Sequence, residues 1–163
     1  MNELSLWKHY LESRGSTRYE LYLELHKIAS SDQLSDELVI DLFESLSSNS
    51  QSNVMSALLL LSRQALFQST HYNSEILLKT FDNVLNYRSI FQFQLIDSLV
   101  GFCAHEKCSK DVIGWSIMQF NIAKQTHQTK TIQAYLKVLN EIKKAHPQVE
   151  GIELLNELCE NNL

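Results

Sequence analysis

The sequence predicts an all-α protein, on the basis of three observations. The 163 residues include one Pro and four Gly, fewer turn residues than a sheet-rich fold of this length usually needs. Apolar side chains recur at helical spacing along nearly the whole chain. At the centre, residues 57–61 read ALLLL, within a stretch (residues 52–68) that lacks Gly and Pro. A helix that is apolar on every face is enclosed by its neighbours, so we expect this stretch to form the central helix.

Three helices are predicted ahead of the central one. The first lies within residues 3–13, and Gly15 just beyond it is a typical helix terminator. Thr17 and Glu20 match the capping box that opens a helix, so a second helix is expected to start at Thr17. Ser35 is expected to begin a third helix. Its inward-facing side chains would be Leu38, Leu42, Phe43 and Leu46.

Five more helices are predicted after the polar loop of residues 47–52 and the central helix. Residues 71–73 lead into one whose apolar side chains include Ile76, Leu77, Phe81, Val84 and Leu85. Residues 87–106 form a densely apolar helix. Ser109 and Thr129 are expected to cap the next two helices. Pro147 ends the second of these and starts a short last helix that runs through Leu158.

The predicted helix starts fall into two interleaved sets. One set is Thr17, Ser52, Ser89 and Thr131, and the other is Ser35, Asn73, Ser109 and Gln148. Within each set the step is roughly 35 to 42 residues, the length of a two-helix solenoid repeat. This organisation resembles the HEAT and armadillo class of α-helical repeats. The resemblance implies about nine helices in antiparallel pairs, stacked with a right-handed twist in a single domain of residues 1–163. An irregular helical bundle is the alternative.

Composition and charge narrow the function classes. The formal net charge of −5 argues against a nucleic-acid binder and against binding to anionic membrane surfaces. The central stretch is too short to span a bilayer, and Arg63 and Gln64 interrupt it. The amphipathic N-terminal segment lacks the basic and apolar regions of a signal peptide, so a cytoplasmic location is expected. The three Cys residues are then expected to be free thiols.

One cluster carries possible metal ligands: Cys103, His105 and Cys108. A structural zinc site normally needs four ligands, and no second pair lies nearby in the sequence. We therefore expect a buried thiol, a histidine at a helix end and a cysteine in a loop, with a redox switch as a lesser alternative. The chain also lacks a glycine-rich phosphate loop and a Gly-flanked nucleophilic serine. The expectation is a protein without catalytic residues, metal or cofactor.

Charge is distributed unevenly along the chain. Residues 1–62 contain nine acidic and four basic side chains, whereas residues 63–163 contain ten of each. No Lys or Arg occurs in residues 28–62. The predicted third helix carries Asp36, Glu37, Asp41 and Glu44, of which the last three share one stripe opposite the apolar face. We interpret these four residues as a candidate partner-binding surface for a basic protein face. The alternative is an ordinary solvated helix face.

A small acidic helical protein without catalytic residues is most simply a binding protein. The chain is similar in size, helical pattern and acidity to the helical immunity proteins of bacterial toxin systems, including contact-dependent inhibition. The resemblance implies a monomer or weak dimer that occludes the basic face of a cognate toxin domain, such as a nuclease. One alternative is an adaptor or scaffold that binds another cellular protein. The other is an enzyme or metal-dependent sensor centred on Cys103, His105 and Cys108.

Overall fold

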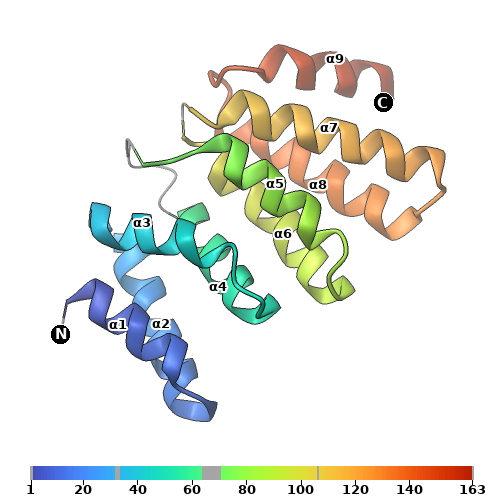
Figure 1. The fold of residues 1–163 in the computed structure, drawn as a ribbon. Helices are drawn as coiled ribbons and strands as arrows, with labels where there is room; N and C mark the ends of the chain where they lie inside the picture. The colour runs from blue at the N-terminus through green and yellow to red at the C-terminus, as the bar shows by residue number, and fades with distance from the viewer. Residues whose placement is uncertain (1, 32–33, 64–70, 106, 163) are drawn as a thin grey trace. The chain divides into compact units, whose positions relative to one another are not determined.

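The computed structural model describes residues 2–31, 34–63, 71–105 and 107–162. Within these ranges every regular element is an α-helix, which confirms the all-α prediction (Figure 1). The nine helices of this part of the chain are α1 (Glu3–Glu12), α2 (Gly15–Ser31), α3 (Asp36–Ser45), α4 (Gln51–Arg63), α5 (Ser74–Val84), α6 (Ser89–Phe102), α7 (Ser109–Gln125), α8 (Thr129–Ala145) and α9 (Ile152–Asn162). None of the described helices is long and apolar enough to cross a membrane.

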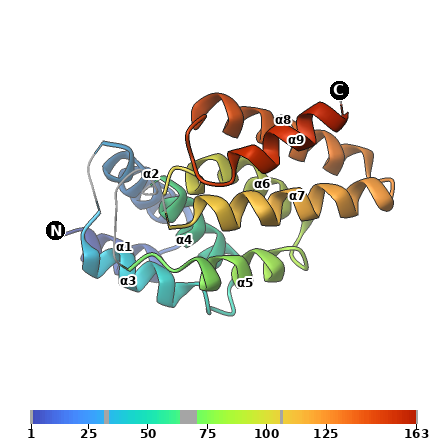
Figure 2. The ribbon, with the colours of Figure 1, turned by 90° about the horizontal axis from the view of Figure 1, so that it is seen from above.

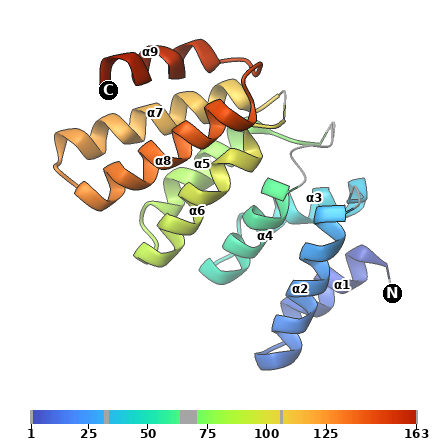
Figure 3. The same cartoon turned by 180° about the vertical axis from the view of Figure 1, so that it is seen from behind.

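The helices gather into two compact units, residues 1–72 and residues 73–163. In the first unit, α1 contacts α2 and α3, and α4 contacts α2 and α3. In the second unit, α5 and α7 contact each other, as do α6 and α8, and the pairs α5–α6 and α7–α8 join these layers (Figures 2 and 3). Helix α9 packs on both α7 and α8. Each unit is therefore a small helical stack, in which most helices contact a chain neighbour and the helix two positions on.

The centre of α4 is enclosed, as its sequence predicts. Its buried apolar side chains are Val54, Met55, Ala57, Leu58, Leu60 and Leu61. Leu59 differs from the prediction, because it is only half-buried. It lies on one strip with Ser52 and Arg63, which are both exposed. The described neighbours of α4 therefore leave this strip partly open to solvent. Residues 64–68 of the predicted central helix lie outside the described residues.

An aromatic stack joins the helices of the first unit. Trp7 stacks on Tyr10 with ring centroids 5.2 Å apart, and Tyr10 lies 5.9 Å from Tyr22. The Trp7 indole Nε1 donates to Ser45 Oγ on α3 at 3.3 Å. The Tyr10 hydroxyl is bonded to Ser56 Oγ on α4 at 2.6 Å. Two side chains of α1 thus contact the three other helices of the unit, and their polar atoms are satisfied inside it.

A second aromatic cluster forms the core of residues 73–163. Phe81 of α5 lies 5.3 Å from Phe102 and 5.2 Å from Trp115, ring centroid to ring centroid. Trp115 in turn lies 6.4 Å from Tyr135 of α8. Trp115 Nε1 donates to Asp82 Oδ1 at 2.9 Å, which satisfies its indole at the edge of the core. Helices α5 to α8 therefore share one hydrophobic core.

The helix ends agree with the prediction at some positions and not at others. Ser35 and Asn73 are side-chain caps, accepting from the backbone N–H groups of Leu38 and Ile76. The prediction for Thr17 was wrong, because α2 begins at Gly15. Gly15 has φ +62°, the left-handed conformation in which Gly carries no steric penalty, so the chain restarts a helix at once.

Two other caps also differ, and one apolar side chain is exposed. Cys108, not Ser109, precedes α7, and Ser109 Oγ is buried without a hydrogen-bond partner in the described structure. Gln128 precedes α8, and Thr129 is its first residue. Ile76, one of the apolar side chains expected in α5, is 41% exposed. It lies at the edge of the apolar stripe of α5, where periodicity alone does not decide burial.

The first prediction separates two adjacent leucines of α4. Leu60→Ala should lower the free energy of unfolding by about 2–5 kcal/mol, the usual cost of truncating a fully buried Leu. Leu59→Ala should cost less, because its side chain is already partly in solvent. Urea unfolding followed by circular dichroism measures both. Equal losses below about 0.5 kcal/mol at the two sites would show that this side of α4 is not enclosed.

Candidate functional site

The outward face of α3 carries the residues singled out from the sequence. Ser35 caps the helix, and Leu38, Val39 and Leu42 bury its inner face. Glu37, Asp41 and Glu44 lie one turn apart along the opposite face, as predicted. Glu37 and Glu44 are exposed, and Asp41 is half-buried.

Ile40 belongs to the same outward face. It follows Glu37 by three positions and precedes Glu44 by four, and 40% of it is exposed. The face of α3 therefore combines an accessible aliphatic side chain with carboxylates around it. An apolar centre with a polar rim is the usual anatomy of a protein interface.

Helix electrostatics accounts for only part of this acidity. Asp36 and Glu37 lie in the first turn of α3, where negative charge is stabilised by the helix dipole. Glu3 of α1 adds a carboxylate there, since its Oε2 accepts from the Ser35 backbone N–H at 2.8 Å. Glu44 lies in the last turn, where the dipole disfavours an anion. The helix dipole therefore does not explain why Glu44 lies at this end of α3.

Cations do not neutralise the acidic stripe within the described structure. Glu37, Asp41 and Glu44 form no salt bridge with any residue described. Asp36 Oδ2 lies 3.9 Å from His71 Nε2, with side-chain exposures of 62% and 39%. Such an exposed pair adds little to stability, and it carries full charge only when His71 is protonated. Glu37 and Glu44 are therefore exposed carboxylates that no described cation pairs with.

Two arginines of the first unit, Arg18 and Arg63, are engaged with other groups. The Arg18 guanidinium lies 4.0 Å from the Tyr10 ring centroid and donates to Asn53 Oδ1 at 2.6 Å. Arg63 Nε donates to His26 Nδ1 at 2.7 Å, and its Nη1 donates to Ser30 Oγ at 3.2 Å. Both guanidinium groups therefore join α2 to α4, and neither forms a salt bridge with a carboxylate of α3 in the described structure.

His26 is held neutral by this arrangement. Burial, and secondarily the charge of Arg63, lowers its pKa from 6.5 to about 4. Its ring lies 4.1 Å from that of Tyr22, centroid to centroid. Since Nδ1 accepts from Arg63, the ring proton sits on Nε2, which is buried without a partner among the described residues. Protonation would place a second positive charge beside Arg63.

The Cys103, His105 and Cys108 cluster lies in the turn between α6 and α7. All three residues are fully buried. Burial raises the pKa of Cys103 to about 12 and that of Cys108 to about 11, so both thiols are protonated at neutral pH. A protonated thiol is a poor nucleophile and a poor metal ligand. Across the described ranges, no three His, Cys, Asp or Glu residues are arranged to hold a metal ion.

Comparison of the chain with protein-family models, with curated protein sequences and with solved structures finds no match. Any function assigned to the chain therefore rests on its own residues. Sequence reasoning identified the acidic stripe but missed Ile40, whose position on the same face follows from its spacing to Glu37 and Glu44. It also missed the Arg63–His26 contact, which joins residues 37 positions apart and leaves no local sequence pattern.

The pKa of His26 leads to a test of pH dependence. In the unfolded chain His26 binds its proton near pH 6.5, whereas in the folded chain it does so near pH 4. The unfolded state binds more protons in that window, so the contribution of His26 to stability is lost as the pH falls through it. His26→Gln, which can still accept from Arg63, should show a shallower fall in melting temperature between pH 6.5 and pH 4. The exposed His9→Gln serves as the control, and parallel curves for His26→Gln and wild type would contradict the assignment.

The cysteine cluster gives a second test. Purified protein should contain less than one zinc per chain, and Cys103→Ser should not change its metal content, because both thiols are buried and protonated. Elemental analysis measures this directly. One zinc per chain that is lost in the Cys103→Ser variant would establish the metal site that we do not expect.

Proposed function

We propose that this chain is a protein-binding inhibitor, an immunity protein that binds a cognate toxin domain and covers its basic face. The docking surface is the outward face of α3, with Asp36, Glu37, Asp41 and Glu44 around Ile40. The supporting observation is that the three carboxylates of the stripe are accessible and form no salt bridge within the described chain. The immunity role is supported in addition by the likeness to helical immunity proteins in size, helical pattern and acidity.

The mechanism combines electrostatic steering with occlusion. Carboxylates along one helix face attract a surface that binds phosphates, and complementary charge accelerates encounter and sets the register of the complex. Ile40 would be dehydrated on contact and contribute apolar burial at the centre. The bound helix would then occupy the place of the toxin's substrate. No catalytic group of the inhibitor is needed for this function.

Reversal of the stripe tests the proposal. Glu37, Asp41 and Glu44 changed together to Lys should weaken binding to the partner by several kcal/mol, because like charges would then oppose each other. The partner is first identified by affinity capture and mass spectrometry. Affinity and association rate are then measured against salt, since exposed charges are screened over about 8 Å at physiological ionic strength.

A matched control separates local from global charge. Asp97, Glu141 and Glu157 are exposed residues of the second unit, and changing all three to Lys alters the net charge by the same amount. This variant should bind nearly as wild type. If both triple variants bind equally well and the association rate does not depend on salt, the stripe is only a solvated face. Capture of an ordinary cellular protein without toxin activity would favour the adaptor alternative.

A further inference from the structure

Helix α2 has one side that no other described helix covers. It contacts α1 and α4 (Figure 3). Of its 17 residues, only Leu25 and Ala29 are buried. The side chains opposite them are all exposed, and we call them the outer stripe of α2: Ser16, Glu20, Leu23, Lys27 and Ser31. The described helices therefore leave this stripe open to solvent.

The outer stripe has an apolar centre. Leu23 is 50% exposed, and Tyr19, one turn earlier on the same side of the helix, is 63% exposed. An open groove of about 510 Å³ runs beside Leu23, and its described lining comes from α2 alone. Accessible apolar and aromatic side chains with charged residues around them are typical of a surface that packs against another protein.

The charges of the outer stripe are not paired within the described chain. Glu20 and Lys27 form no salt bridge with any described residue. Glu24, on the flank of the stripe, forms none either, although it precedes Lys27 by three positions, a spacing at which helix side chains can pair. The stripe thus carries both signs of charge without a counter-charge among the described residues.

The order of these charges makes the outer stripe complementary to a copy of itself. Glu20 precedes Leu23 by three positions, and Lys27 follows it by four. When two copies of α2 lie antiparallel with their Leu23 side chains in contact, Glu20 of each copy lies opposite Lys27 of the other. Ser16 and Ser31 then face each other at the two ends. A parallel arrangement would place like charges opposite each other, which disfavours association.

We propose that the outer stripe of α2 is the contact surface of a symmetric dimer, and that a second copy of this chain occupies it. The two copies use the same surface, related by a two-fold axis at Leu23, which is the commonest symmetry of homo-oligomers. Leu23 and Tyr19 supply the apolar contact, and the two Glu20–Lys27 pairs fix the antiparallel direction. Because only one helix face of each copy takes part, the dimer is weak and dissociates on dilution.

Charge exchange on the full chain tests the proposal. Sedimentation velocity over about a hundredfold range of protein concentration measures the dimer. Glu20→Lys and Lys27→Glu each place like charges opposite each other at two positions, so each should weaken dimerisation at least about tenfold. An equal mixture of these two variants should dimerise again, because each copy then carries a single sign of charge along the stripe and meets the opposite sign on its partner. Leu23→Ser should also weaken the dimer, without a change in charge.

Matched controls come from the second unit. Glu75 and Lys79 are exposed residues of α5, and Glu75→Lys and Lys79→Glu alter the net charge by the same amounts as the two variants of α2. Both controls should dimerise as the wild type does. Circular dichroism and the melting temperature establish that each variant is folded, so a loss of the dimer is not a loss of structure.

Three outcomes would overturn the proposal. They are a wild-type chain that stays monomeric over the whole concentration range, a Glu20→Lys variant that dimerises as strongly as the wild type, and a mixture of Glu20→Lys and Lys27→Glu that stays monomeric. The outer stripe of α2 shares no residue with the docking surface of α3, and no partner protein takes part in the assay. Its outcome is therefore independent of the proposed inhibitor function.

Discussion

Each helix of this protein has to bury an apolar stripe on two neighbours at once. Helices of 10 to 17 residues are marginal in isolation, so their stability comes from that packing. Helix α4 shows the constraint most clearly, because it lies against both α2 and α3 and buries almost its whole centre. The same pattern of contacts with the chain neighbour and with the next helix but one holds together α5 to α8. The outward face of α3 is one of the surfaces that this packing leaves exposed to solvent.

Close helix packing also dictates how the many hydroxyl side chains are used. Ser45, Ser56, Thr80 and Ser116 each donate to the backbone carbonyl four residues earlier, so the hydroxyl is satisfied within its own helix. Ser45 and Ser56 then offer their oxygens to Trp7 and Tyr10. Because the Ser56 proton is already donated, Tyr10 is the donor in that pair. These four hydroxyl side chains therefore serve contacts within and between helices.

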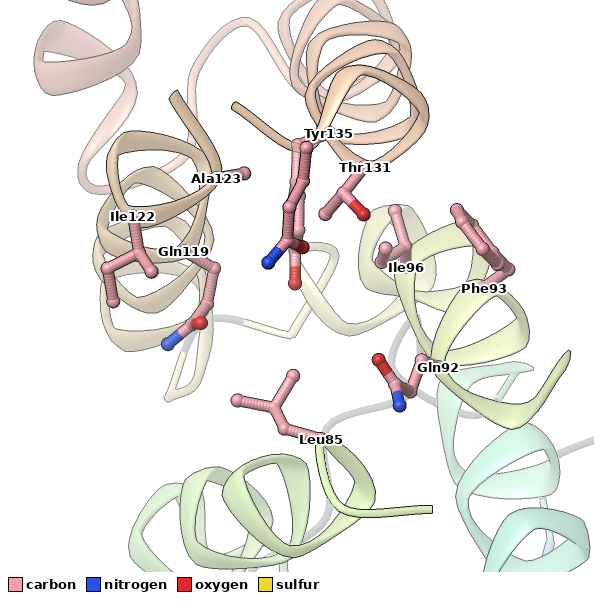
Figure 4. Close-up of a pocket in the computed structure, with 10 residues that line it drawn as sticks. Leu85, Gln92, Phe93, Ile96, Gln119, Ile122, Ala123, Thr131 and Tyr135 are labelled. Carbon is pink, nitrogen blue, oxygen red and sulfur yellow. The ribbon is translucent and has the colours of Figure 1, made fainter. Parts of the chain in front are cut away.

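The sequence predicts helices here because apolar periodicity is read directly from the chain. The helix starts expected near Ser35 and Asn73 agree with the structure, where both residues are side-chain caps. Thr17 misled because the left-handed Gly15 begins a helix two residues earlier, and a sequence does not report φ. The acidic stripe was predictable from spacing, whereas the pocket between the end of α5 and helices α6, α7 and α8 was not. Its lining residues lie on separate helices, and only their packing brings Tyr135 and Gln92 to the same space (Figure 4).

The contacts made by Arg18 and Arg63 bear on the electrostatics of the outward face of α3. A guanidinium group offsets the electrostatic repulsion among nearby carboxylates only within about a Debye length, roughly 8 Å at physiological salt. Arg18 and Arg63 make their contacts with Tyr10, Asn53 and His26, and neither pairs with a carboxylate of α3 in the described structure. Glu37, Asp41 and Glu44 therefore have no paired cation among the described residues. A basic partner that replaces the missing cations would gain from every carboxylate on that face, and Ile40 would add apolar contact that salt does not weaken. An interface of this kind would lose association rate in salt more than it loses the contacts that hold the complex once formed.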